Sequence, residues 1–196
     1  MGPFAGFMMP IQYPAGLKAE HLHTREAAGL FDVSHMGQLR IRSKRGDLAS
    51  LAQELERALP VDLLDWPSDQ QRYSVLLNDA GGIVDDLMLV LRLSDGDAPE
   101  IRMVVNASNR AADLARLRAL CPGLVIEEVD AALLALQGPL AESVLARLDA
   151  RAAEPTFMQA CDLTLEGATC FATRSGYTGE DGFVISRSEE HTSELQ

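Results

Sequence analysis

Cysteine is scarce in this chain of 196 residues, which contains only Cys121, Cys161 and Cys170. The number is odd and no C-x-x-C pair occurs, so the pattern favours reduced thiols over a disulfide framework or a metal site. The histidines near the start form no H-E-x-x-H motif, and no zinc-ligand spacing is visible. The sequence therefore predicts no bound metal and is typical of a cytoplasmic protein.

Basic residues and long apolar runs are also few. The chain has 17 Lys and Arg against 29 Asp and Glu, which gives a formal net charge of −12. This balance argues against nucleic acid as a partner, because nucleic-acid binding needs a basic surface. No run approaches the ~18 apolar residues of a membrane span, and no signal peptide is visible. The remaining composition, 47% hydrophobic and 23% charged, indicates a globular protein of one or two domains.

The last ten residues, R-S-E-E-H-T-S-E-L-Q from Arg187 to Gln196, are polar throughout. With one choice of codons they back-translate to a widely used short-read sequencing adapter. We therefore expect residues 187–196 to be an adapter-derived artefact that fold reasoning should leave out, and the natural chain to be interrupted after about Ser186. A polar C-terminal tail is the alternative.

Helical and strand-like apolar spacings are mixed along the chain without strict alternation, which favours an α+β fold over a doubly wound sheet. N-D-A-G-G at 78–82 joins two apolar runs and signals a hairpin. The apolar segment 3–16 is expected to be extended and packed on a core. The predicted helices are 17–28, 47–59, 110–120 and 140–148, and the predicted strands are 38–41, 73–77, 83–93, 101–105, 124–129, 133–137, 163–166, 168–175 and 182–186.

The hairpin carries two adjacent carboxylates, Asp85 and Asp86, inside an apolar strand. Neighbouring strand residues point to opposite faces, so one carboxylate is expected in water and the other among Leu87, Met88 and Leu89. A carboxylate in apolar surroundings is costly unless it is paired or protonated, and proteins keep such groups mainly where a charge meets a ligand. A solvated hairpin flank, with Asp bonded to turn amides, is the plainer alternative.

Three further residues are candidates for a binding site. Tyr73 lies on the facing strand, either as a core residue with a satisfied hydroxyl or across from the carboxylate. Asn106 follows the apolar strand of V-V-N-A-S-N, where helix capping alone would account for it. Tyr177 lies between two glycines in S-G-Y-T-G-E-D-G-F, which is a plain turn or a mount for a ring that stacks on a flat heterocycle. This stretch lacks the G-x-x-x-x-G-K-[ST] pattern of a phosphate loop.

His35 in D-V-S-H-M-G lies close to Asp32 and Ser34 and suggests a hydrolase triad. A triad needs partners that converge from separate elements, and no G-x-S-x-G elbow is present. We expect a structural turn here.

Several long motifs occur in order along residues 1–186: P-F-A-G-F-x-M-P, R-E-A-A-G-L-F-D-V-S-H-M-G, Y-S-V-L-L-N-D-A-G-G-I-V-D-D-L, V-V-N-A-S-N, A-L-Q-G-P and G-Y-T-G-E-D-G. Together they resemble the aminomethyltransferase (T protein) family of the glycine cleavage system. The resemblance implies an enzyme that moves a one-carbon unit from the aminomethyl-lipoyl arm of the H protein to tetrahydrofolate, with release of ammonia and without metal or pyridoxal phosphate. The chain would be an N-terminal fragment of such an enzyme.

The resemblance also implies site residues. Asp86, the second acid of the D-D pair, matches the catalytic carboxylate and is expected to be the buried one. Tyr73, Asn106, Tyr177 and Met36 match folate-contacting positions. Val184 stands where the family has a pterin-binding Glu, and a downstream Arg-Asp motif is not found. These departures imply weak folate binding and no activity for the chain by itself.

The resemblance implies a folate-binding T-protein-like fold. It would have a discontinuous first domain, 1–45 with 131–186, an inserted α+β domain at 46–130, and no third, C-terminal β-barrel domain. Two alternatives remain open. One is the folate-binding domain of an amine-demethylating flavoenzyme, and the other is a non-catalytic folate-binding protein of iron–sulfur assembly, although the Lys-Gly-Cys loop of that group is not seen.

Overall fold

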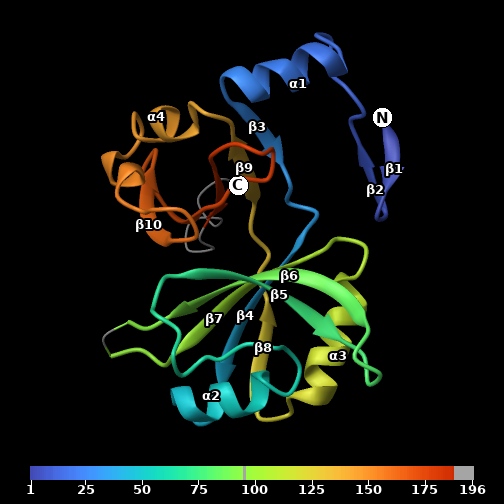
Figure 1. The fold of residues 1–196 in the computed structure, drawn as a ribbon, viewed down its shortest axis with the longest axis vertical. Helices are drawn as coiled ribbons and strands as arrows, with labels where there is room; N and C mark the ends of the chain where they lie inside the picture. Colours follow the sequence, from blue (N-terminus) through green and yellow to red (C-terminus); the bar gives the residue numbers. More distant parts are fainter. Residues whose placement is uncertain (95, 188–196) are drawn as a thin grey trace. The chain divides into compact units, whose positions relative to one another are not determined.

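The computed structural model describes residues 1–94 and 96–187 (Figure 1). Contacts divide the chain into two compact units: a first unit of Met1–His35 with the described residues from Ala131 onward, and a second unit, Met36–Asp130. The sequence had placed residues 36–45 in the first domain. They lie in the second unit because β4 (Gly37–Ser43) pairs with strands β7 and β8 of that unit.

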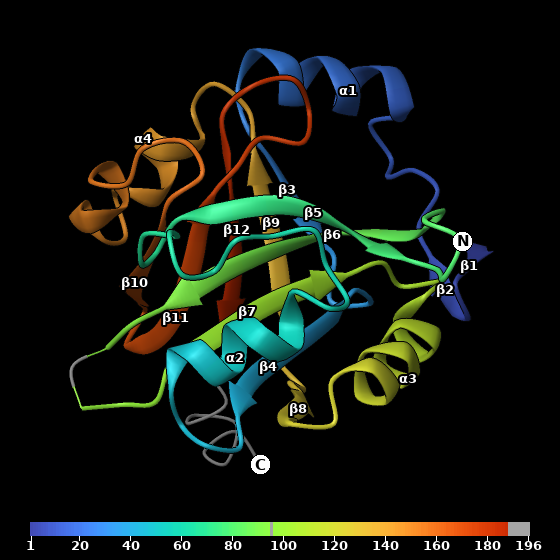
Figure 2. The ribbon, with the colours of Figure 1, turned by 60° about the horizontal axis from the view of Figure 1, so that its bottom comes forward.

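The second unit is built on one antiparallel sheet of five strands in the order β5-β6-β7-β4-β8. Its helices α2 and α3 lie against one face of this sheet, as Figure 2 shows. Leu51 and Leu55 of α2, with Leu114 and Leu117 of α3, join the sheet residues in one apolar core. The element bounds are β5 Gln71–Leu77, β6 Ile83–Arg92, β7 Glu100–Val105, β8 Leu124–Glu128, α2 Leu48–Leu55 and α3 Arg110–Leu120.

The β5–β6 hairpin forms as predicted, and its turn is closed by one side chain. Asn78 Oδ1 accepts hydrogen bonds from the backbone N–H groups of Ala80 and Gly82, both at 2.9 Å. Gly81 has a φ of 79°, which a residue with a side chain rarely adopts. A bulge between Leu76 and Leu77 shifts the register by one residue, and beyond it Tyr73 lies opposite Met88 and Val75 lies opposite Asp86.

The first unit is built on a second antiparallel sheet of five strands in the order β10-β11-β12-β9-β3. Its core joins Leu136, Leu163 and Phe183 of this sheet with Ala141 and Leu145 of α4. The element bounds are α1 Leu17–Glu26, β3 Gly29–Asp32, β9 Leu133–Gln137, α4 Ala141–Leu145, η1 Ala150–Ala153, β10 Ala160–Leu165, β11 Ala168–Arg174 and β12 Gly182–Arg187. Of the expected adapter-derived segment, Arg187 ends β12, and residues 188–196 lie outside the described residues.

The N-terminal segment forms a small hairpin of β1 (Gly2–Phe4) and β2 (Phe7–Met9). The expectation that this segment packs on a core is wrong, because Phe4 is 54% exposed, Phe7 45% and Met8 61%. Ala5 and Gly6 have φ values of 48° and 84°, so the chain turns back at once and pairs with itself.

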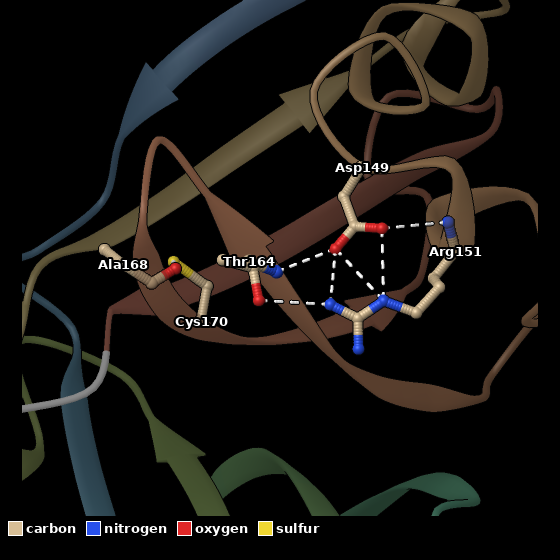
Figure 3. A network of polar contacts seen from close by, with 5 residues as sticks. All are labelled: Asp149, Arg151, Thr164, Ala168 and Cys170. Carbon is tan, nitrogen blue, oxygen red and sulfur yellow. Dashed lines mark hydrogen bonds and ion pairs between the residues drawn. The ribbon is translucent and has the colours of Figure 1, made fainter.

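A polar network around Asp149 joins η1 to β10 (Figure 3). Asp149 Oδ1 accepts from the backbone N–H of Arg151 at 3.0 Å, and Oδ2 accepts from the backbone N–H of Thr164 at 2.8 Å. The Arg151 guanidinium pairs with the same carboxylate at 2.6 Å. The hydrogen bonds from Arg151 and Thr164 hold the pKa of Asp149 well below its ordinary value.

The three cysteines are free thiols, as the sequence favoured. Burial raises the pKa of Cys121 to about 11 and that of Cys161 to about 11, so neither is set up as a nucleophile. In the described part of the chain, no His, Cys, Asp and Glu side chains form a group that could hold a metal ion. A search of the helices in the same residues finds none with the length and apolarity to span a membrane.

Candidate functional site

The alternation along β6 separates the two adjacent acids, as strand geometry requires. Asp85 lies on the core face with Leu87 and Leu89 and is only 5% exposed, whereas Asp86 lies on the opposite face and is exposed. The expectation that Asp86 is the buried carboxylate is therefore wrong, because the core-facing register of the strand places Asp85 inside. The prediction that one of the two acids is buried is confirmed, but the buried acid is Asp85.

Asn106 links the two acids, since it follows β7 directly and its side chain reaches back over β6. Its Nδ2 lies 3.0 Å from Asp85 Oδ1, 3.0 Å from the Asp86 backbone oxygen and 3.0 Å from Asp86 Oδ1. Its backbone N–H also donates to Asp85 Oδ2 at 3.1 Å. Helix capping does not explain this residue. Asn106 instead ties the carboxylate of Asp86 to that of Asp85.

Tyr73 lies on the same face of the sheet as Asp86. Tyr73 is 60% exposed, so it is not a core residue. The pKa of the Tyr73 hydroxyl is raised, first by its loss of hydration and then by the charge of Asp86 and a hydrogen bond with it. The hairpin register thus brings together an aromatic ring, a carboxylate and an amide: Tyr73, Asp86 and Asn106.

Two residues of this site were not singled out from the sequence. Asn109, at the start of α3, donates from Nδ2 to Asp85 Oδ1 at 2.8 Å. Asp113, one turn further along α3, has no exposed surface. Its burial, followed by a hydrogen bond with Asp85 and the charge of Asp85, raises its pKa. The available signal was the position of Asp113 beside the apolar stripe of Leu114 and Leu117, where a charged residue needs a reason.

The remaining predicted folate contacts are Met36 and Tyr177, and Val184 replaces a further one. Met36 is half-buried in the bend before β4, in the second unit. Tyr177 is 57% exposed and belongs to the first unit. Val184 is half-buried in β12, opposite Ala135 and Thr173. Within the second unit the structure groups Tyr73, Asp86 and Asn106, and the pairing of Gly37 with Val105 brings Met36 to the same end of β4 and β7 as Asn106.

A buried amide makes three hydrogen bonds to the loop that carries Tyr177 and to the strand that follows it. Gln137, 1% exposed at the end of β9, accepts through Oε1 from the Tyr177 N–H at 2.7 Å. Its Nε2 donates to the backbone oxygens of Ser175 at 3.2 Å and Phe183 at 3.4 Å. Gly176 is required here, because a Cβ would lie 1.8 Å from the backbone oxygen of Glu180. These contacts fix the loop as a turn in which Tyr177 is exposed.

The segment around His35 is a structural turn, as expected. Asp32 Oδ1 accepts from the Ser34 N–H at 3.0 Å, and Ser34 Oγ donates to the Leu133 backbone oxygen at 3.3 Å. The His35 ring contacts the rings of Phe4 and Phe7, with centroids 5.7 and 6.0 Å away. These bonds use Ser34 and Asp32 in the turn and do not build a triad.

A hollow of about 360 Å³ lies along α3, lined in part by Ser108, Arg110 and Leu114. Tyr73, Asp86 and Asn106 are not among its lining residues. This hollow is therefore not itself the group formed by Tyr73, Asp86 and Asn106, although its lining begins at Ala107, next to Asn106.

The two antiparallel sheets with their helices define an α+β protein, and one sheet carries the polar group of Tyr73, Asp86 and Asn106. The profile of the family described as the GCVT N-terminal domain matches residues 1–196. The chain belongs to this family.

Curated relatives and a solved structure agree with this assignment. The mitochondrial aminomethyltransferase of Dictyostelium discoideum is 40% identical over 199 residues, covering 95% of this chain and 47% of the relative. An aminomethyltransferase of Thermus thermophilus is 42% identical, covering 94% and 52%. The crystal structure of glycine cleavage system aminomethyltransferase T from Bartonella henselae matches with a TM-score of 0.83 and 43% identity, covering 94% of this chain and 48% of that one. The chain thus spans about half the length of the relatives it matches.

Proposed function

We propose that this chain is the catalytic-carboxylate portion of a glycine cleavage aminomethyltransferase. The whole protein would move the one-carbon unit of aminomethyl-lipoyl H protein to tetrahydrofolate in the cytoplasm, without metal or pyridoxal phosphate. The observation that carries the proposal is the grouping of Tyr73, Asp86 and Asn106 in a chain of this family. The relatives reported above are aminomethyltransferases, and neither alternative class appears among them.

The three side chains suit a reduced pterin as acceptor. The exposed ring of Tyr73 offers a face on which a flat heterocycle can stack. The exposed carboxylate of Asp86 can accept from an N–H group of the folate and is oriented by the Asn106 amide at 3.0 Å. Met36 and Tyr177 remain further proposed contacts, supported by the family resemblance and not by this grouping.

The transfer makes two bonds from the one-carbon unit to folate nitrogens. The carbon–sulfur bond to the lipoyl arm and the carbon–nitrogen bond to the amine break, and the two folate N–H protons leave with the lipoyl thiol and ammonia. No oxidation or reduction is needed. A carboxylate beside the nitrogens favours the cationic, iminium-like state by its opposite charge and can accept a proton from the folate. Asp86 is proposed for this role.

A chimera tests the activity. The chain would replace the matching half of the Thermus thermophilus aminomethyltransferase, and methylenetetrahydrofolate formation from aminomethylated H protein would be measured. Asp86→Asn should lower the rate by about a hundredfold or more, because general acid–base and charge effects of one group reach this size. Asp97→Asn, an exposed acid in the β6–β7 connection, is the matched control and should leave the rate unchanged.

Ligand contact is tested on the chain by itself. Tetrahydrofolate at millimolar concentration should shift the NMR signals of Tyr73, Asp86 and Asn106, and Asp86→Asn should weaken the effect. The predicted affinity is low, because Val184 replaces the acid that the family resemblance places on the pterin. Shifts confined to other residues, or equal rates for Asp86→Asn and Asp97→Asn chimeras, would remove Asp86 from the proposed role.

A further inference from the structure

Asp113 is a buried acid without an ordinary partner. It lies in α3 with no exposed surface, and neither of its carboxyl oxygens receives a hydrogen bond from an N–H or hydroxyl donor of the described residues. A buried carboxylate without donors or a cation is strongly unfavourable. The side chain therefore needs another way to be satisfied.

Asp113 lies one helical turn beyond Asn109 in α3, and Asn109 Nδ2 donates to Asp85 Oδ1 of β6, so Asp113 lies on the helix face that meets Asp85. Asp85 is already well supplied with hydrogen-bond donors. Its oxygens accept from the Asn106 N–H at 3.1 Å, Asn106 Nδ2 at 3.0 Å and Asn109 Nδ2 at 2.8 Å. Two neighbouring buried carboxyl groups cannot both be charged at low cost, and one shared proton resolves the conflict. The donors collect on Asp85, so the proton belongs on Asp113.

The electrostatics agree with this geometry. Burial, followed by the hydrogen bond with Asp85 and its charge, raises the pKa of Asp113 to about 7. Burial would also raise the pKa of Asp85, but the hydrogen bonds from Asp113, Asn106 and Asn109 outweigh it, so that pKa falls below its ordinary value.

The arginines of α3 are engaged elsewhere and do not neutralise Asp113. Arg110 pairs with Glu128 at 2.8 Å, and Arg116 donates to the Leu77 backbone oxygen at 2.6 Å and pairs with Asp79 at 2.9 Å. Arg118 donates to the Ile126 backbone oxygen at 3.1 Å. Asp85 is the charged group that raises the pKa of Asp113, and Asp86 is linked to this pair through Asn106.

We propose that Asp113 is a positioning residue for the candidate site: as a carboxylic acid it donates a hydrogen bond to Asp85, and Asp85 and Asn106 then hold Asp86 in its orientation. The inference rests on the proposed function for the importance of Asp86, but not for the proton. Loss of that proton places two negative charges in contact beside Asn106, so the orientation of Asp86 becomes sensitive to pH around neutrality.

The proton can be observed directly in the chain without ligand. Carboxyl ¹³C NMR over pH 4–9 should show Asp113 titrating near neutral pH, and the Asn106 side-chain amide signals should shift with the same midpoint. Titration of Asp113 near the ordinary value of about 4, or Asn106 signals that do not follow it, would overturn the inference.

Two substitutions separate a positioning role from simple packing. Asp113→Asn keeps a donor toward Asp85 but cannot titrate, so the Asn106 signals should stay at their low-pH positions throughout. Asp113→Ala removes the donor, and solvent exchange of the Asn106 amide should rise about tenfold. Asp97→Asn is the control and should behave as the parent chain does. If Asp113→Ala does not fold, the NMR titrations of the parent chain and of Asp113→Asn still test the proposal. Identical Asn106 behaviour in the parent chain and both Asp113 variants would sink the proposal.

This test and the test of function can fail independently. If Asp113 titrates near neutrality and Asn106 follows, but the Asp86→Asn chimera keeps its rate, the proton-sharing pair stands and the proposed function falls. If Asp86→Asn abolishes transfer while Asp113 titrates near 4, the function stands and the positioning role falls.

Discussion

Asp113 in the second unit and Asp149 in the first unit are the same side chain in opposite situations. Asp149 caps η1, accepts from two backbone N–H groups and pairs with Arg151, and its pKa is lowered. Asp113 is fully buried in α3 beside another acid, and its pKa is raised to about 7. The supply of donors therefore decides the charge of each acid.

The comparison also separates two uses of a carboxylate. At η1 the acid is a connector, because its charged form joins Arg151 and the Thr164 backbone (Figure 3). At α3 the acid holds a proton, because Asp85 has taken the available amide donors. The pattern of charges along the sequence does not distinguish Asp113 from Asp149. Changes of pH and single substitutions should separate them.

The largest effect is expected at Asp85, on which the second unit's polar group converges. Asp85→Ala leaves the Asn106 and Asn109 donors unpaired and Asp113 without its acceptor, so the free energy of unfolding should fall by about 4 kcal/mol. Asp86→Ala, the exposed neighbour, should cost under about 1 kcal/mol. Urea unfolding measures both, and equal losses would contradict the assignment of Asp85 as the buried acid.

The second effect is a pH dependence that belongs to Asp113. The unfolded chain loses this proton near its ordinary pKa of 3.8 and the folded chain near 7, so the folded state binds more protons between these values. Stability should therefore fall as pH rises from about 4 to about 7, by on the order of 3 kcal/mol, and level off above. Asp113→Asn should flatten this slope in thermal unfolding. A slope unchanged by the substitution would contradict the prediction.

The third effect has the opposite sign and a different window. The pKa of Asp149 lies below its ordinary value of 3.8, so its contribution is present above that value and is lost as pH falls below it. The parent chain should lose Tm between pH 4 and 2 more steeply than Asp149→Asn. Asp113→Asn serves as the control here, because its difference from the parent lies above pH 4.

The smallest effect is expected at the edge of the Asp149 network. Thr164 Oγ1 accepts from Arg151 Nη2 at 3.1 Å at an exposed position. Thr164→Val removes this bond but keeps the backbone N–H that Asp149 needs, so the free energy of unfolding should fall by under about 1 kcal/mol. Differential scanning calorimetry can detect a loss of this size, and a larger loss would show that the hydroxyl is a main part of the connector.

Most of the fold could be predicted from local patterns. The hairpin signal at 78–82 and the apolar stripe of α3 gave those elements to within a few residues, because turn chemistry and periodicity act locally. Strand β3 (Gly29–Asp32) was missed because its apolar residues, Leu30 and Phe31, are exposed in the chain and its pairing with β9 is long-range. The β1–β2 hairpin was missed because Ala5 gives no turn signal, although its φ is positive.

The sequence identified most residues of the candidate site, but it did not predict how they are arranged. Alternation required that Asp85 and Asp86 face opposite ways, but only the pairing of β6 with β5 and β7 shows which acid faces the core. Asn106 was explained locally as a cap, whereas its bonds reach back about 20 residues to β6. Asp113 could not be assigned without knowing that α3 packs beside Asp85.

Gln137 carries a consequence for how this protein can vary. One side chain accepts from Tyr177 and donates to Ser175 and Phe183, so its two ends have fixed and opposite polarity. Glutamate has the same length but lacks the donor, and methionine lacks both functions. Neither of these residues of similar length can replace Gln137 without breaking bonds of the tyrosine loop, so we expect this position to tolerate few substitutions.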